Sequence, residues 1–397
     1  NTFLKIMQVK KIVAVTCCRS EYDILYSFLR ELHESDSFEL SVIVAGAHLS
    51  ENYGNTVLEV VEDGFPIAGT IHNLINSDKK VGKAKSAGIL LTELSEKLNF
   101  MNPDFVVVAG DREETVTTAI SCIYLEIPLI HIAGGDRTFP GEFSGDVDEP
   151  IRHATSKMAH IHFTMNEEHS ERLIKMGEEP YRICCTGNPA LDRFAYISSI
   201  GREELCEYFG FSDAEKPLVL VIQHVISSEA DDGARQIGTT LDALKEFDIN
   251  CIVNYPNSDI GSQGMIEIIE HYSDNPCFRI RRNIPRFYFV NLLKEIDILV
   301  GNSSLALLEG SFLKIPAINV GIRQKDRLNG GNVVFVDHDK NEIKNIVNRI
   351  LNDSDYRADI KACTSIYGDG TASKKMVAFL DSLKESRAQL IAKNITY

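Results

Sequence analysis

The stretch Leu299–Gly310 reads LVGNSSLALLEG, and its order of residue types predicts a strand, a tight turn and a helix. The run Ile298–Val300 is apolar, the turn Gly301–Ser304 is small and polar, and a helical run follows at Leu305. Such a turn leaves backbone N–H groups free at a helix N-terminus, where proteins bind phosphate groups. The turn has no lysine, which excludes a Walker loop. We therefore expect an anion-binding turn of another kind.

The strand-then-helix pattern extends along the first half of the chain. Helical stretches such as Glu21–His33, Val81–Phe100 and Glu113–Ile127 alternate with short apolar, β-branched runs. The predicted strands are Lys11–Thr16, Leu40–Ala45, Phe105–Ala109, Leu129–Ile132, His160–Met165 and Ile183–Thr186. Alternation of this kind indicates a parallel sheet with crossover helices.

The pattern restarts near Gly201 after a link at about Asn188. The strands predicted for the second half are Leu218–Gln223, Cys251–Tyr255, Phe278–Arg281, Ile298–Val300 and Ala317–Val320, and the predicted helices are Thr239–Phe247, Met265–Tyr272 and Phe287–Glu295. We therefore predict an α/β fold with two Rossmann-like, doubly wound domains that face each other across a cleft. Ligands in such sheets bind at the carboxyl ends of the strands.

The composition restricts the class of protein. The 397 residues suit two domains, and the 44% of hydrophobic residues suffices for sizeable cores. The net charge of −16 argues against nucleic-acid binding and against docking on an anionic membrane. No stretch approaches the roughly 20 apolar residues of a membrane span. The nine cysteines contain no CxxC motif, which favours free thiols and a cytoplasmic location.

Polar residues follow the predicted strands of the first half. Capping of the next helix explains one carboxylate in such a place, but it does not explain their number. Several carboxylates in one cleft push their pKa values apart, which suits general acid–base chemistry. The candidates are Arg19, Asp111, Arg112, Asp136, Asp148, Glu149 and Arg152.

Polar residues also follow four predicted strands of the second half. Each is weak evidence alone, but four polar strand ends on one edge of a sheet indicate a ligand site. A carboxylate in the helix after the Gly301–Ser304 turn suits a vicinal diol such as a ribose. The candidates are His224, Asn257, Ser303, Ser304, Glu309 and Arg323.

In their order, the motifs of the chain resemble a known family. They are CRSEYD at Cys18–Asp23, YGNT at Tyr53–Thr56, GDR at Gly110–Arg112, HIAGG followed by DEPIRHATSKMAHIH, QH at Gln223–His224, PNSDIGS, GNSSLALLEG, INVGIRQ and IYGDG at Ile366–Gly370. The set, which spans about Lys11–Gly370, is similar to the hydrolysing UDP-N-acetylglucosamine 2-epimerases of sialic-acid biosynthesis.

The resemblance implies a glycosyltransferase-B-like fold. We expect an N-terminal Rossmann-like domain over residues 8–190, a UDP-binding domain over 200–370, and a C-terminal helix within 371–397 that packs back on the first domain. The expected partners are a UDP-sugar substrate and the product UDP, and we expect a homodimer or homotetramer. No metal and no cofactor is implied.

The same resemblance assigns roles to the candidates. Ser303, Ser304 and Arg19 would hold the diphosphate, His224 would reach the diphosphate or the sugar, and Glu309 would take the ribose hydroxyls. Arg112, Arg152, Asn257 and Arg323 would be further contacts of the UDP-sugar. The acid–base residues would be Asp111, Asp136, Asp148 and Glu149. Ala133 stands where many members have Glu, so which carboxylate takes the C2 proton stays open.

The implied reaction begins with loss of UDP, because no carbonyl group acidifies the C2 hydrogen of the sugar. A carboxylate then removes that proton to give a glycal, and water adds to C1 while an acid protonates C2 from the other face. The products would be N-acetylmannosamine and UDP.

Four alternatives remain open. The first is the same reaction on a UDP-2,4-diacetamido-trideoxyhexose, on the legionaminic-acid route. The others are a non-hydrolysing epimerase, a glycosyltransferase of similar fold and a non-catalytic UDP-sugar sensor. We place UDP-N-acetylglucosamine first.

Overall fold

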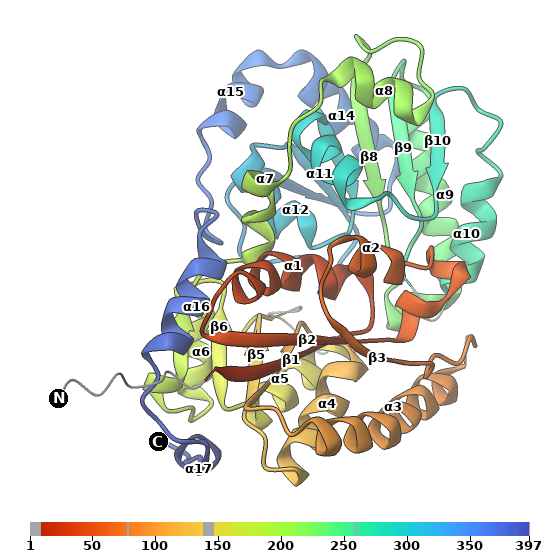
Figure 1. The fold of residues 1–397 in the computed structure, drawn as a ribbon. Coiled ribbons are helices and arrows are strands. Elements are labelled where there is room, and N and C mark those ends of the chain that lie inside the picture. Colours follow the sequence, from red (N-terminus) through yellow and green to blue (C-terminus); the bar gives the residue numbers. More distant parts are fainter. Residues whose placement is uncertain (1–8, 78, 138–146, 258, 260, 397) are drawn as a thin grey trace.

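The computed structural model describes residues 9–77, 79–137, 147–257, 259 and 261–396. Two parallel β-sheets, each covered by helices, lie one above the other with a cleft between them (Figure 1). This arrangement confirms the predicted fold class. None of the described helices is long and apolar enough to span a bilayer.

The first sheet has the strand order β3-β2-β1-β4-β5-β6-β7, and its paired strands are parallel. The strands are β1 (Lys10–Thr16), β2 (Phe38–Ala45), β3 (Ile67–Ile71), β4 (Phe105–Ala109), β5 (Leu129–Ile132), β6 (Ile161–Thr164) and β7 (Ile183–Cys185). Its helices are α1 (Arg19–His33), α2 (Val57–Glu62), α3 (Lys80–Met101), α4 (Glu113–Tyr124), α5 (Asp148–Met158) and α6 (Glu167–Lys175).

The central strand β4 of this sheet is apolar throughout because helices cover both faces of the sheet. Every residue of β4 is buried. On one face α1 contributes Leu25 and Phe28 to a core, and on the other α3 contributes Leu90 and Leu94 to a second core. The apolar runs that predicted these strands are therefore the consequence of two-sided burial.

The second sheet has the order β10-β9-β8-β11-β12-β13, again with parallel pairs. The strands are β8 (Leu218–Ile222), β9 (Asn250–Asn254), β10 (Phe278–Arg281), β11 (Ile298–Gly301), β12 (Ala317–Val320) and β13 (Val333–Val336). The helices that follow the link are α7 (Arg193–Tyr196), α8 (Arg202–Phe209), α9 (Gly233–Leu244), α10 (Ser262–Glu270), α11 (Arg286–Glu295), α12 (Leu305–Leu308), α13 (Gly310–Leu313), α14 (Lys340–Asn352) and α15 (Ser354–Ala362).

Several elements differ from the sequence prediction. Strands β3 and β13 were not predicted, and both are edge strands whose residues are mostly half-buried or exposed. Strand β3 has no continuous apolar run, whereas β13 has one of only four residues, which the prediction missed. Helix α9 begins at Gly233, where the prediction began at Thr239, because its first turn has few apolar residues.

The C-terminal segment returns to the first domain (Figure 1). Helix α16 (Ala372–Ser382) places Met376 and Leu380 in the core beside α1. The predicted final helix is in fact two helices, since Ser386 begins α17 (Arg387–Ile391) with a capping box to Gln389.

The chain therefore crosses between the domains twice, and the two crossings touch. Asn188 N–H donates to the Tyr367 carbonyl at 2.6 Å. Gly187 and Gly368 have φ of +94° and +114°, and a Cβ on either would lie about 3 Å from the other's Cα. Only glycine suits both the positive φ and this close approach.

Candidate active site

A cavity of about 290 Å³ lies between the carboxyl ends of the two sheets. Residues of both domains line it, as expected for doubly wound sheets that face each other. Of the residues that sequence analysis selected, those that line the cavity are Arg19, Asp111, Arg112, Asp136, Asp148, Arg152, His224, Asn257, Ser303, Ser304, Glu309 and Arg323. Only Glu149 of the selected residues is absent from the described lining.

The turn after β11 differs from the predicted strand–turn–helix. Helix α12 is a single turn that ends at Leu308, and Glu309 interrupts the helical path with φ −123° before α13 begins. A helix this short contributes little dipole, so the local N–H groups matter more. Among the described residues, no acceptor bonds the backbone N–H of Ser303 or Ser304. The turn thus offers two N–H donors to an anion in the cavity.

Asn302 fastens this turn to the end of β8. Its side chain accepts from His224 N–H at 2.7 Å and donates to the His224 carbonyl at 2.8 Å. Asn302 is fully buried, so both bonds are shielded from water. The ends of β8 and β11 are thereby held in one arrangement.

His224 is neutral in this cavity. Burial and the nearby guanidinium of Arg323 lower its pKa to about 3. Its Nδ1 accepts the backbone N–H of Asn257 at 3.1 Å, so the ring proton is on Nε2. His224 is therefore set to donate a hydrogen bond through Nε2.

Arg19 reaches into the cleft from the first domain. Its guanidinium stacks on the Phe289 ring at 4.4 Å and donates to Asn283 Oδ1 at 2.6 Å, and both partners belong to the second domain. Asp23 lies 3.5 Å from Arg19 Nε. A cation placed between both domains in this way suits a bridging anion such as a diphosphate.

Asp111 is held in the cavity by an ion pair with Arg152, which is almost fully buried. The backbone before it is fixed by His131, whose Nε2 donates to the Gly110 carbonyl at 2.8 Å. Burial lowers the pKa of His131 to about 3, so this ring is a neutral structural group. Sequence reasoning did not select His131, because nothing in the local pattern distinguishes it from core histidines.

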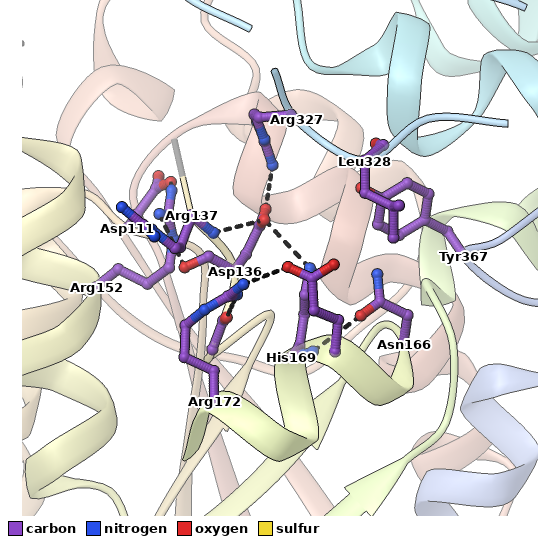
Figure 2. A network of polar contacts seen from close by, with 12 residues as sticks. Asp111, Asp136, Arg137, Arg152, Asn166, His169, Arg172, Arg327, Leu328 and Tyr367 are labelled. Atoms are coloured by element: carbon purple, nitrogen blue, oxygen red, sulfur yellow. Dashed lines mark hydrogen bonds and ion pairs between the residues drawn. The ribbon is translucent and has the colours of Figure 1, made fainter. Parts of the chain in front are cut away.

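Asp136 lies at the centre of the network in Figure 2. Its carboxylate pairs with Arg327 of the second domain and lies 3.2 Å from His169 Nε2. Burial alone would raise the pKa of Asp136, but Arg327 and His169 outweigh it and hold the pKa well below its usual range. The carboxylate is therefore ionised and able to act as a base rather than an acid.

Two further carboxylates face arginines across the cleft. Asp148 Oδ2 lies 3.8 Å from Arg323 Nη2, and Arg112 donates to Asp259 Oδ1 at 3.1 Å. Glu149 instead lies beside its neighbours Arg152 at 3.6 Å and His153 at 3.0 Å. Its position suits orienting Arg152, and its place among the acid–base residues stays a prediction.

The domain junction adds charged residues that sequence reasoning missed. Arg193 is buried between Glu309, to which it donates at 2.7 Å, and Asp23, at 3.2 Å. Arg286 at the start of α11 stacks on Tyr26 at 4.0 Å and pairs with Asp63 of the first domain. The part of the chain that the structure describes contains no group of three His, Cys, Asp or Glu placed to hold a metal.

Comparison with known families matches residues 30–381 to the model described as UDP-N-acetylglucosamine 2-epimerase. The chain belongs to this family. A curated relative from Legionella pneumophila, the UDP-N,N'-diacetylbacillosamine 2-epimerase (hydrolyzing), is 34% identical over 94% of this chain and 96% of its own. The family confirms the resemblance found in the motifs, and it makes the chain an enzyme of the UDP-sugar 2-epimerase type.

Two other relatives show how the family members differ in substrate. The GDP/UDP-N,N'-diacetylbacillosamine 2-epimerase (hydrolyzing) of Campylobacter jejuni is 31% identical over 83% of this chain and 84% of its own. The UDP-N-acetylglucosamine 2-epimerase of Neisseria meningitidis serogroup B is 32% identical over 86% of this chain and 87% of its own.

Solved structures share the fold. The UDP-GlcNAc 2-epimerase from Neisseria meningitidis bound to UDP-GlcNAc superposes with a TM-score of 0.80, covering 94% of this chain and 100% of that chain at 19% identity. A Staphylococcus aureus MnaA–UDP structure superposes with a TM-score of 0.78, covering 95% and 98% at 17% identity. These likenesses establish the two-domain architecture.

Proposed function

We propose that the protein is a hydrolysing UDP-sugar 2-epimerase that acts on a UDP-2,4-diacetamido-2,4,6-trideoxyhexose. The observation that carries the reaction is the position of three carboxylates, Asp111, Asp136 and Asp148, in one cavity with the Ser303–Ser304 turn. This cavity brings acid–base groups of one domain to an anion site of the other. The products would be UDP and the free 2,4-diacetamido-2,4,6-trideoxymannose.

The choice of sugar differs from the first expectation. The relatives from Legionella and Campylobacter are both hydrolysing enzymes named for diacetylbacillosamine, so UDP-N-acetylglucosamine becomes the second candidate. The Neisseria relative and the Escherichia coli polysialic acid biosynthesis protein P7 favour this second candidate. With it, the role in sialic-acid biosynthesis also becomes the second proposal.

An apolar wall of the cavity supports the trideoxy sugar. Ala133, Met165, Ile222 and Leu305 line the cavity and belong to one apolar cluster. A 6-deoxy sugar has a methyl group where N-acetylglucosamine has a hydroxymethyl group, and a second acetamido group adds another methyl. Burial of each such group against an apolar wall is worth about 0.8 kcal/mol.

The binding roles follow from the contacts. We assign the diphosphate to the N–H groups of Ser303 and Ser304 and to Arg19, and the ribose hydroxyls to Glu309. His224 donates its Nε2–H to an oxygen of the diphosphate, where negative charge grows as UDP departs. Further contacts of the UDP-sugar would come from Arg112, Arg152, Asn257 and Arg323.

The first step is an elimination. The C1–O bond to UDP breaks with its electron pair leaving on UDP, and C1 gains oxocarbenium character. That charge acidifies the C2 hydrogen, so a weak base suffices to remove it. Asp136 fits this role because Arg327 and His169 keep it ionised. The electrons of the C2–H bond form the C1=C2 double bond of the glycal.

The second step is hydration. Water adds its oxygen to C1 and gives one proton to the carboxylates of the cavity, while a carboxyl group returns a proton to C2 from the opposite face. This inverts C2 and gives the free sugar, and the proton that Asp136 took from C2 is released to solvent. The proton donor must lie across the sugar ring from Asp136. Asp111 and Asp148 are the two other carboxylates of the cavity, and we assign the proton return to this pair. The reaction balances without a metal or a cofactor.

Proton NMR in deuterated water tests the proposal. We expect the diacetamido substrate to give UDP and a 2-epimer deuterated at C2, at a higher kcat/KM than UDP-N-acetylglucosamine. A higher kcat/KM with UDP-N-acetylglucosamine would make that sugar, and not the diacetamido sugar, the proposed substrate. A 2-epimer still attached to UDP would indicate the non-hydrolysing reaction. Binding without turnover of either sugar would contradict an epimerase. A cytoplasmic homodimer or homotetramer stays a prediction of the sequence.

A further inference from the structure

Three separate segments of the chain hold the carboxylate of Asp136. Oδ2 accepts from Arg327, which lies in the loop after β12, and Oδ1 accepts the Arg137 N–H at 2.7 Å. His169 of α6 places Nε2 3.2 Å from Oδ1 (Figure 2). Only 10% of the Asp136 side chain is exposed. Both carboxylate oxygens are therefore fixed in direction.

His169 is itself fixed by its surroundings. The residue is 2% exposed, and its backbone N–H donates to Asn166 Oδ1 at 2.9 Å. Its ring lies 6.0 Å from the ring of Tyr367. Because a carboxylate only accepts, His169 Nε2 carries the proton of this contact. Among the described residues, no hydrogen-bond partner faces its Nδ1, so Asp136 is the polar contact that explains a buried histidine here.

Tyr367 connects His169 to the loop that carries Arg327. The Tyr367 hydroxyl donates to the Leu328 carbonyl at 2.8 Å, next to Arg327. Tyr367 is 1% exposed, so this bond is protected from water. Tyr367 therefore contacts both His169 and the loop of Arg327, the two side chains that donate to Asp136, as Figure 2 shows.

Arg327 also belongs to the network of the anion-binding turn. Its Nη1 donates to Gln324, whose Nε2 donates to the Asn302 carbonyl at 3.1 Å. Asn302 in turn bonds both backbone groups of His224. A continuous set of hydrogen bonds therefore runs from Asp136 in the first domain to the Ser303–Ser304 turn in the second.

We propose that His169 and Arg327 are positioning residues, which aim the Asp136 carboxylate at the sugar when the two domains close on the nucleotide. The inference rests on the proposed function, in which Asp136 removes the C2 proton. Fixing both oxygens removes the side-chain freedom that a base would otherwise lose in the transition state. Since Arg327 comes from the domain with the anion turn, the base is oriented only in the closed arrangement.

A simple clasp between the domains is the competing explanation. Arg286 provides the comparison, because it also bridges the domains, through Asp63, Glu59 and Asp23, but makes none of its described contacts with Asp136. A clasp affects affinity and stability, whereas a positioning residue also affects the ionisation of Asp136. The pH dependence of turnover separates the two explanations.

Other charged groups face Asp136 and must stay constant in that comparison. Arg152 Nη1 donates to the Asp136 carbonyl at 3.4 Å. A second cavity of about 310 Å³ adjoins Asp136, and its described lining adds Arg137, Glu168, Arg172 and Asp326. None of these groups is altered in the variants below.

The test compares removal with conservative replacement. His169→Phe and Arg327→Gln remove a donor, whereas His169→Gln and Arg327→Lys keep one. For the first pair we expect kcat to fall roughly 10- to 100-fold with KM within about threefold. The acid limb of kcat/KM should move to higher pH, since Asp136 loses a group that stabilises its charge. The second pair should recover part of both effects. Arg286→Gln should raise KM and leave the acid limb in place.

Wild-type protein in the same assay distinguishes failure of the proposed function from failure of the positioning roles. If wild type turns over neither sugar, the proposed function fails. If it does, but His169→Phe and Arg327→Gln keep the wild-type acid limb, the positioning roles are wrong. A double variant that combines Asp136→Asn with His169→Phe or with Arg327→Gln gives a test that does not depend on loss of the fold. The second change should cause little further loss of kcat when Asp136 is already replaced. Full additivity there would also overturn the inference.

Discussion

Arg193 of the domain link donates to Glu309 Oε2 at 2.7 Å, so the carboxylate assigned to the ribose depends on a residue outside its own domain. Burial raises the pKa of Glu309, and Arg193 opposes that rise. The same guanidinium lies 3.2 Å from Asp23 in α1. One buried cation thus compensates two carboxylates from different domains.

Removal of Arg193 should destabilise the protein strongly. Arg193→Met leaves Asp23 and Glu309 buried without their shared cation, which costs about 3–5 kcal/mol when a buried pair is broken. We expect a clear fall in the urea midpoint of unfolding. The matched control is Arg235→Met, because Arg235 pairs with Asp232 on the exposed surface and should leave the midpoint in place. Equal midpoints for the two variants would contradict the role of Arg193.

Glu309→Gln should weaken UDP binding selectively at the ribose. A hydrogen bond to a charged group is worth about 1.5–3 kcal/mol, so the dissociation constant should rise roughly 10- to 100-fold. Calorimetry with UDP and 2'-deoxy-UDP measures this. The Glu309→Gln variant should lose most of the preference for UDP over 2'-deoxy-UDP. An unchanged ratio of the two affinities would remove Glu309 from the ribose site.

Asn302→Ala should disturb the anion turn and His224 together. The change removes both bonds to the His224 backbone, so we expect UDP affinity to fall roughly tenfold or more. Asn352→Ala, in an exposed position of α14, is the control. If Asn302→Ala bound UDP as wild type does, the two strand ends would not depend on this side chain.

Stability should fall toward acid pH. Burial lowers the pKa of His48, His131 and His160 to about 3, whereas these groups titrate near 6.5 in an unfolded chain. Between those values the unfolded state binds more protons, so the free energy of unfolding decreases as pH falls below 6.5. Thermal unfolding in buffers from pH 7 to 4 measures this slope. An unfolding temperature that rose on acidification would contradict it.

Stability should also fall on the alkaline side of neutrality. Burial and a neighbouring carboxylate raise the pKa of Glu21 to about 8 and that of Glu114 to about 7. The contribution of these two carboxyl groups to the free energy of unfolding is fully present below pH 4.5. It is lost as pH rises through 7 and 8, because the folded state must then give up protons that it held. Glu21→Gln should flatten the fall between pH 6.5 and 8.5. Glu203→Gln, on the exposed face of α8, should not.

The sequence predicted those parts of the fold that burial determines. Central strands such as β4 and β8 are apolar throughout, and their runs located them within a residue or two. Edge strand β3 is mostly half-buried or exposed and has no such run, and the short apolar run of edge strand β13 was missed. Helix α12 ends at Leu308, and Glu309 directly after it accepts from Arg193, a tertiary contact that no local pattern encodes.

The same distinction applies to the site. Residues directly after predicted strands, such as Asp111 and His224, were found because strand ends meet at one edge. Three residues of the site were missed because their partners lie far away in the sequence. Arg327 is 191 residues from Asp136, His169 is 33 residues from Asp136, and Arg193 is 116 residues from Glu309. Arg323 was selected because it follows β12. Arg327 lies four residues later in the same loop, so this loop was the signal that could have pointed to Arg327.

The contact of Gly187 with Gly368 has a mechanical consequence. A single linker lets two domains tilt and twist about several directions. Two linkers that touch and are hydrogen-bonded at one point hold the two domains together there. Opening and closing of the cleft would then be a rotation about that point, and the domains would not slide past each other.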